Sequence, residues 1–354
     1  MRKKEQVEDR NSLLIEALDQ IERDKGISKS VLIDAIENSL YAACKNHFGK
    51  ADNIKVTIDD ITGEVNVYAQ KEIVDVVEDS TSQISTAQAA QFFPDNEPGD
   101  IVNVVVTPEN FGRIAAQKAK QVVVQKIREE ERKVLYNEYY EKERDITTGT
   151  VQRISGNNIS INLGRVDTDL TENEQVKTEH FVPNEKIKLY VVEVRDTTKG
   201  PKITVSRTHP ELVKRLFELE VPEVQDGTVE IRNIAREAGS RTKIAVLSNN
   251  PDVDPVSACV GTNGNRVNKV VEELRGEKID IVNWNEDPAV FIENALSPAK
   301  VLSVTADPEE KTAKVVVPDY QLSLAIGKEG QNARLAARLT GYKIDIKSDI
   351  EEMQ

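Results

Sequence analysis

The sequence predicts a multidomain α+β protein, with an α+β N-terminal domain containing a long helix, a small β-barrel, and two tandem α/β domains. The length of 354 residues exceeds that of one ordinary domain. Hydrophobic periodicity changes near Asp145 from helical spacing to short, strand-like runs. The chain beyond this second segment contains an internal repeat. We therefore expect four domains, at residues 1–144, 145–208, 209–286 and 287–354.

Helical patterns open and close the first segment. Apolar residues recur at i, i+3, i+4 and i+7 from Leu14 to Ile21 and predict one helix. A second helix follows, with Ser28 as its N-cap. Strand-like alternation comes next, over residues 53–58 and 63–69. A long helix is expected from about Glu109 into the charged stretch 128–144, whose alternating charges are typical of a solvated helix face.

The second segment is rich in β-branched residues and punctuated by glycines. Its predicted strands are residues 148–154, 158–163, 186–194 and 202–206. Short, closely spaced strands with glycine corners predict a five-stranded barrel, and about 60 residues fit the oligonucleotide-binding class. Aromatic candidates for base stacking are few, namely Phe181 and Tyr190, beside His180.

The internal repeat consists of two copies of one domain. The string Gly261-Thr-Asn-Gly264 aligns with Gly327-Lys-Glu-Gly330. Downstream, Lys278-Ile-Asp-Ile281 aligns with Lys343-Ile-Asp-Ile346. Each copy predicts the order helix, strand, strand, short helix, GxxG, helix, strand. The expected pairs of strands are residues 228–234 and 243–247 in the first copy, and 299–305 and 312–317 in the second.

A GxxG turn between two helices is suited to bind a nucleic-acid backbone. The N-terminus of the following helix offers unpaired N–H groups and the positive end of the helix dipole to an anion. Glycine permits positive φ and close approach of a sugar-phosphate chain. This arrangement is that of the KH module, which clamps about four nucleotides. The candidate RNA contacts are Gly261, Thr262, Asn263, Gly264, Arg266 and Lys269 in the first copy, and Gly327, Lys328, Glu329, Gly330, Asn332, Arg334 and Arg338 in the second.

Composition argues against several other classes. The net charge of −14 gives no support to a membrane-surface protein or to broad DNA coating, and no apolar run resembles a signal peptide or a membrane span. The only cysteines, Cys44 and Cys259, form no disulfide or zinc pattern. The three histidines are scattered, and no catalytic or metal constellation is recognised. We expect a cytoplasmic protein, without cofactor, that is not an enzyme.

Longer strings resemble one family, the bacterial transcription termination/antitermination factors called NusA. Residues 206–217 resemble its junction after the S1 domain, which is an oligonucleotide-binding barrel. Residues 274–281 and 321–333 resemble parts of its two KH domains, here expected to be type II. The resemblance implies that residues 1–144 bind the RNA polymerase core and that S1-KH-KH binds single-stranded nascent RNA. It also implies partnership with other elongation and antitermination factors, and we expect a monomer.

Two other functions remain open from the residues. S1 and KH modules also accompany the exoribonuclease polynucleotide phosphorylase, although in KH-then-S1 order and behind a catalytic core that residues 1–144 do not resemble. A ribosome-associated KH protein is the third possibility. The sequence departs from relatives of the NusA family in the first GxxG turn, where Thr262-Asn263 has no basic side chain. We therefore expect the first turn to hold phosphate less tightly than the second.

Overall fold

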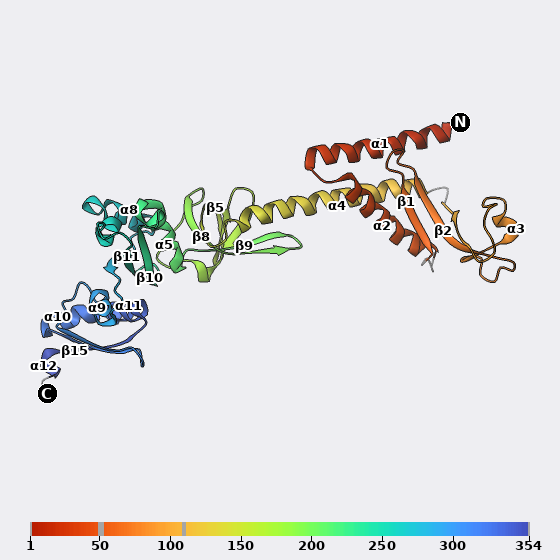
Figure 1. The fold of residues 1–354 in the computed structure, drawn as a ribbon. Helices are drawn as coiled ribbons and strands as arrows, with labels where there is room; N and C mark the ends of the chain where they lie inside the picture. Colours follow the sequence, from red (N-terminus) through yellow and green to blue (C-terminus); the bar gives the residue numbers. More distant parts are fainter. Residues whose placement is uncertain (1, 49–52, 108–110, 353–354) are drawn as a thin grey trace. The chain divides into compact units, whose positions relative to one another are not determined.

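The computed structural model describes residues 2–48, 53–107 and 111–352. It divides into two compact units, Met1–Val134 and Leu135–Gln354, each of which is described by itself (Figure 1). The predicted multidomain α+β class, with one barrel-like sheet and two similar α/β domains, is confirmed.

The first unit combines long helices with a four-stranded sheet. Helices α1 (Arg2–Lys25) and α2 (Lys29–Phe48) precede strands β1 (Ile54–Ile58) and β2 (Val65–Val74). Short elements follow and were not predicted: β3 (Gln83–Ser85), α3 (Thr86–Ala89) and β4 (Ile101–Val105). The long helix α4 (Phe111–Tyr140) comes last. The expected start of that helix, Glu109, lies outside the described residues.

Strand β2 organises this sheet because it has partners along its whole length. It pairs antiparallel with β1 and β4 and parallel with β3. The helices bury their apolar face against β1 and the start of β2, with Leu18, Leu32, Ile36 and Leu40 fully enclosed. A separate small core forms around Ile73, where β3, α3 and β4 meet.

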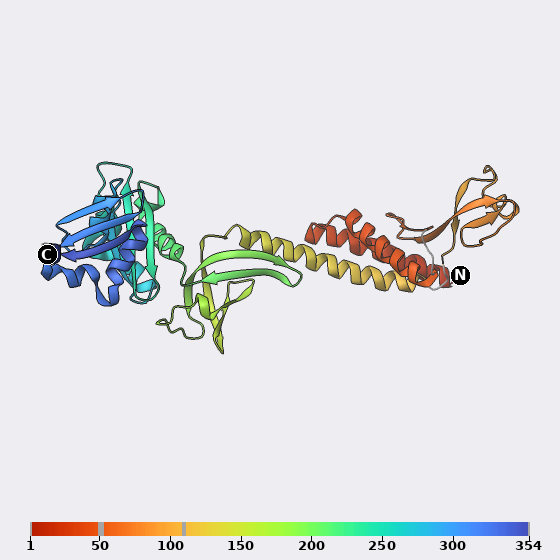
Figure 2. The same cartoon turned by 90° about the horizontal axis from the view of Figure 1, so that it is seen from below.

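The second unit begins with the last turns of α4 and a five-stranded sheet. Its strands are β5 (Ile146–Ser155), β6 (Asn158–Asn162), β7 (Asp167–Leu170), β8 (Lys186–Thr197) and β9 (Gly200–Ser206). Their order is β7-β6-β5-β8-β9, and Figure 2 shows β8 and β9 as a long two-stranded ribbon. The hydroxyl of Thr168 on β7 donates to the Ile203 carbonyl on β9 at 2.5 Å. The two ends of the sheet therefore meet, and the barrel is nearly closed.

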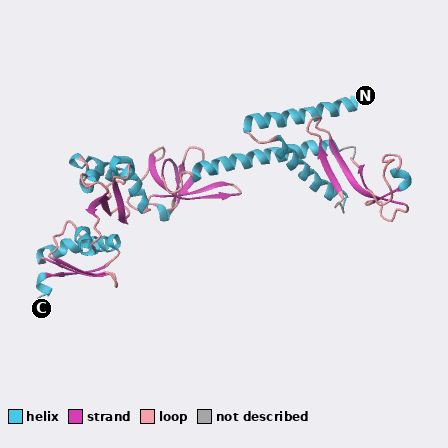
Figure 3. Ribbon diagram, viewed as in Figure 1, coloured by secondary structure: helices cyan, strands magenta, loops and turns pink. Residues whose placement is uncertain are grey.

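Two domains of the same topology follow the barrel. The first contains α5 (Pro210–Glu220), α6 (Pro222–Gln225), β10 (Val229–Glu237), β11 (Arg241–Ser248), α7 (Pro255–Val260), α8 (Asn265–Glu273) and β12 (Lys278–Asn283). The second contains α9 (Pro288–Ala295), β13 (Ser303–Asp307), β14 (Thr312–Val317), α10 (Asp319–Ile326), α11 (Gln331–Thr340) and β15 (Lys343–Ser348), before a short α12 (Asp349–Glu352). In each sheet the first two strands pair antiparallel and the last two pair parallel. Figure 3 shows α9, α10 and α11 gathered on one face of the second sheet.

One predicted strand begins later than expected. The sequence pattern placed it at residues 299–305, whereas β13 begins at Ser303. The amide of Ala299 donates to the Leu296 carbonyl at 3.1 Å, so this backbone still belongs to the turn that closes α9. Pairing with β14 starts only where the Leu302 amide reaches the Val316 carbonyl, at 2.8 Å.

Candidate nucleic-acid interface

The two GxxG turns, Gly261–Gly264 and Gly327–Gly330, have nearly the same backbone conformation. Their first glycines have φ of 73° and 75°, their third residues 53° and 54°, and their last glycines 75° and 74°. In both turns the last glycine's amide donates to the first glycine's carbonyl at 3.1 Å. The repeat in sequence is therefore also a repeat in backbone geometry.

Each turn presents an uncapped helix N-terminus to solvent. The N-cap residues of α8 and α11 are Gly264 and Gly330, so no side chain caps the first turn of either helix. The two central side chains of each turn are exposed. Free amides at a helix start attract an anion, and exposed central residues leave room for a nucleic-acid backbone.

The two glycines of a turn are needed for different reasons. A Cβ added at Gly327 would lie 2.8 Å from Asn332 Cβ and 2.9 Å from its backbone nitrogen. A Cβ at Gly330 would meet no heavy atom closer than Arg334 Nη1, at 4.0 Å. Both residues have positive φ, which disfavours other residues. Gly327 is therefore required by space and conformation, and Gly330 by conformation alone.

Arg266 and Asn332 occupy equivalent positions two residues after their turns and hold equivalent backbone. Arg266 Nη1 donates to the Ala258 carbonyl at 2.7 Å, near the end of α7. Asn332 is buried, and its Nδ2 donates to the carbonyl of Leu324, the counterpart of Ala258, at 3.4 Å, and to the carbonyls of Ala325 at 3.1 Å and Leu296 at 3.0 Å. These two candidate RNA contacts thus tie the helix before each turn to the helix after it.

The cations of the first site are paired within the chain. Arg266 Nη1 lies 2.8 Å from a carboxylate oxygen of Glu223. Lys269 Nζ lies 2.9 Å from a carboxylate oxygen of Glu220, although 64% of the lysine side chain is exposed. Phosphate would have to compete with these two carboxylates for the positive charge.

The second site has both paired and unpaired cations. Arg334 Nε lies 2.6 Å and Arg338 Nη1 3.8 Å from the same oxygen of Glu237, a residue of the first α/β domain. The donated bonds from Arg334 lower the pKa of Glu237. Within the described residues, Lys328 is the one candidate cation without an ion pair. Phosphate would therefore meet one unpaired candidate cation at the second turn.

The two barrel rings considered as candidates for base stacking are enclosed. Phe181 and Tyr190 are only 6% and 5% exposed. Tyr190 stacks on His209 with ring centroids 4.6 Å apart, and Arg275 lies over the Phe181 ring. Both rings therefore pack the junction between the barrel and the next domain and are not available to bases.

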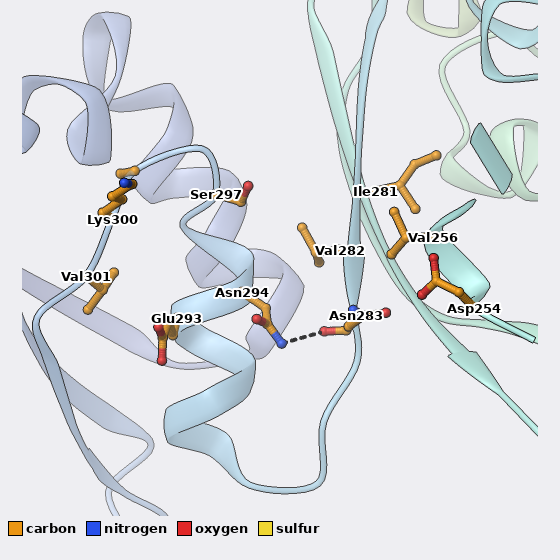
Figure 4. Close-up of a pocket in the computed structure, with 11 residues that line it drawn as sticks. Asp254, Val256, Ile281, Val282, Asn283, Glu293, Asn294, Ser297, Lys300 and Val301 are labelled. Carbon is orange, nitrogen blue, oxygen red and sulfur yellow. Dashed lines mark hydrogen bonds between the residues drawn. The ribbon is translucent and has the colours of Figure 1, made fainter. Parts of the chain in front are cut away.

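An open groove of about 700 Å³ lies between the two α/β domains (Figure 4). The first domain supplies Val256 from α7 and Asn283 from β12, and the second supplies Asn294 from α9 and Lys300 beyond it. Asn294 Nδ2 donates to the Asn283 carbonyl at 3.1 Å, as the dashed line in Figure 4 marks. Amide, carboxylate and ammonium groups on apolar walls could hydrogen-bond the edges of an unstacked base.

Sequence reasoning missed the residues that join the domains of the second unit. Arg207 is fully buried and donates to Glu179 of the barrel, to the Lys188 carbonyl, and to Glu273 of α8. Lys243 is also buried, and its Nζ donates to the Ser297 carbonyl at 2.8 Å, while burial lowers its pKa. The only available signal was a charged residue inside a strand or at its end, which does not reveal its partner.

Cys259 and the groups that could bind a metal were also considered as candidate sites. Cys259 is fully buried, as expected, and burial raises its pKa to about 12. Among residues 2–48, 53–107 and 111–352, no group of His, Cys, Asp or Glu is placed to hold a metal ion. Over the same described ranges, no helix combines the length and apolarity that a bilayer crossing requires.

Comparison with known proteins agrees with this arrangement. Family models match as the NusA N-terminal domain over residues 14–133, the NusA-like first KH domain over 207–284, and the NusA-like second KH domain over 288–354. The transcription termination/antitermination protein NusA of Bacillus subtilis (strain 168) is 54% identical over 341 residues, 96% of this chain and 92% of that protein. The chain belongs to the NusA family.

Two further relatives match over a similar extent. NusA of Halalkalibacterium halodurans is 54% identical over 344 residues, covering 97% of this chain and 90% of that protein. NusA of Thermus thermophilus is 40% identical over 357 residues, covering 97% and 92%. The two α/β domains are thus NusA-like KH domains, and the barrel between the matched segments occupies the position of the predicted S1 domain.

Proposed function

We propose that this NusA-family chain binds RNA polymerase and nascent RNA and modulates pausing, termination and antitermination. The observation that carries the RNA part is the pair of GxxG turns with matching backbone angles, each opening an uncapped helix. Such a turn suits the backbone of single-stranded RNA. Two of them in one compact unit would hold one strand at two points, which raises the apparent affinity.

We assign the two roles to different parts of the chain. Residues 1–144 bind the RNA polymerase core, and the barrel with both KH domains, residues 145–354, binds single-stranded RNA. Other elongation and antitermination factors are further partners, by analogy with the family. The protein acts as a monomer in the cytoplasm, without cofactor or catalytic residues.

Charge reversal in the turns tests the RNA part. Replacing Lys328 and Glu329 by two aspartates sets negative charge against phosphate, so affinity for single-stranded RNA should fall at least about tenfold at low salt. The same change at Thr262 and Asn263 should weaken binding less, because no cation is lost from that turn. Fluorescence anisotropy at two salt concentrations measures binding, and circular dichroism checks that each variant is folded. Two folded variants that bind like the wild type would remove the turns from the mechanism.

The alternative functions have direct tests. Incubation with labelled single-stranded RNA, magnesium and phosphate should leave the RNA intact, because the proposed protein is not an exoribonuclease. Shortening of the RNA would support the enzyme instead. Co-sedimentation with ribosomal subunits in preference to polymerase would favour the ribosome-associated protein.

A further inference from the structure

The turn between β10 and β11 of the first KH domain contacts the start of α11 in the second. Gln331 Nε2 donates to Glu237 Oε2 at 2.9 Å and to Ser240 Oγ at 2.7 Å. Arg334 Nε donates to Glu237 Oε1 at 2.6 Å, and its Nη2 to Oε2 at 3.2 Å. The first domain therefore binds the residues that directly follow the second domain's GxxG turn.

Arg334 extends this contact into the turn itself. Its Nη1 donates to the Glu329 carbonyl at 3.1 Å while its other nitrogens bind Glu237. Glu329 has φ 54° and ψ 26°, a left-handed conformation that costs a non-glycine residue about 1 kcal/mol. A chain of contacts thus runs from Glu237 through Arg334 to the most strained residue of the second turn.

The first GxxG turn has no corresponding support. The offset of 66 residues between the last glycines of the two turns, Gly264 and Gly330, places Asn268 where the second copy has Arg334. Among the described contacts, no side chain donates to the carbonyl of Asn263, the counterpart of Glu329. The two turns have the same shape, but among the residues that the structure describes only the second is contacted by another domain.

Glu277 holds the β10–β11 turn in place through several hydrogen bonds. This buried carboxylate accepts from Arg236 Nε at 2.9 Å, from the Gly239 amide at 2.7 Å and from Thr242 Oγ1 at 2.6 Å. These donors lie on both strands and in the turn between them, so the carboxylate fixes the position from which Glu237 projects. A fully bonded buried carboxylate is difficult to displace.

We propose that Glu237 of the first KH domain is the positioning residue for the GxxG turn of the second, acting through Arg334. The inference rests on the proposed binding of RNA by that turn. It means that the second turn is ready for phosphate only while the two domains are in contact. Glu237 would support binding in spite of its negative charge, which by itself repels RNA.

A double-mutant cycle in the whole 354-residue chain tests the proposal. Affinity for a single-stranded RNA is measured by anisotropy for wild type, Glu237→Ala, Lys328→Asp and the double variant. If Glu237 acts through the turn, Glu237→Ala should weaken binding about fivefold in the wild type and less than about twofold once Lys328 is reversed. Glu237→Gln keeps an acceptor for Arg334 and should give a smaller loss. Glu230→Gln is the matched control, because Glu230 lies on the same strand but pairs with Arg232.

The outcomes separate this inference from the proposed function. Tighter binding by Glu237→Ala would overturn it, because Glu237 would then compete with RNA for Arg334 and Arg338. If Glu237→Ala weakened RNA binding equally in the wild type and in Lys328→Asp, the proposal would also be overturned, because Glu237 would then act independently of the second turn. If Lys328→Asp alone binds like the wild type, RNA binding by the second turn fails and this inference fails with it. Hydrogen exchange of the amides at 328–330 should increase in Glu237→Ala, and unchanged exchange would contradict the positioning role.

Discussion

At the scale of single residues, the two glycines of the second turn should tolerate alanine differently. Gly330→Ala meets only the cost of positive φ, about 1–2 kcal/mol of unfolding free energy. Gly327→Ala adds a contact of 2.9 Å with the backbone of Asn332, and its ψ of 173° is in a region reserved for glycine. We expect its loss to exceed that of Gly330→Ala by at least about 1 kcal/mol. Urea denaturation of both variants measures the difference, and equal losses would show that the backbone shifts freely.

Asn332 and Arg266 show where sequence reasoning reached its limit for side chains. Their position directly after each GxxG turn was evident in the sequence, and both were predicted to contact RNA. The direction in which their side chains point was not evident. It depends on carbonyl groups at the end of the preceding helix and, for Asn332, on the carbonyl of Leu296 at the end of α9. The glycines were more predictable, since a backbone conformation is a local property.

At the level of helices and strands, most strands with an alternating buried face were predicted, whereas β4 and β7, each with one buried residue, were missed. The strand β7 (Asp167–Leu170) buries only Leu170 and therefore carries no hydrophobic alternation. The strand β4 (Ile101–Val105) is mostly β-branched but has one buried residue, Val102, and the pattern around it was not recognised. Strand β4 pairs with β2, which is distant in sequence and cannot be part of a local pattern. Strand β7 pairs with its sequence neighbour β6 and was missed because it lacks hydrophobic alternation.

Contact between the β10–β11 turn and α11 should depend on pH. Arg334 lowers the pKa of Glu237 below its ordinary value of 4.5, with burial opposing this effect. The unfolded state therefore takes up the proton first, so the contribution of Glu237 to stability is present above pH 4.5 and is lost as the pH falls below it. The difference in melting temperature between the wild type and Glu237→Gln should shrink from pH 7 to pH 3. A constant difference would show that the charge of Glu237 contributes nothing.

At the scale of the whole molecule, the buried Arg207 joins the barrel to the first KH domain. Glu179→Ala would leave this guanidinium enclosed with only Glu273 and two carbonyl groups as partners. We expect a loss of about 3 kcal/mol in unfolding free energy, because an incompletely paired buried charge is costly. Glu193→Ala, which removes an exposed partner of Arg195 from the same barrel, should cost less than about 1 kcal/mol. Similar small losses for both variants, measured by denaturant titration, would contradict this role of Arg207.

The order of domains was predictable because each has its own periodicity and the KH copies repeat long strings. Their junctions were not, because Arg207, Lys243 and Glu237 find their partners in other domains. The pairing of cations beside the GxxG turns accounts for part of the excess of acidic residues. Carboxylates pair with four of the five cations beside the GxxG turns, which reduces non-specific attraction to polyanions.

We propose that different parts of this chain bind polymerase and RNA. Capture of RNA polymerase core by immobilised residues 1–144 and, separately, by residues 145–354 tests it most directly, with anisotropy of a single-stranded RNA measured on the same two fragments. We expect residues 1–144 to retain polymerase in the absence of RNA and residues 145–354 to bind RNA in the absence of polymerase. Polymerase retained only by residues 145–354, with none on residues 1–144, would contradict it.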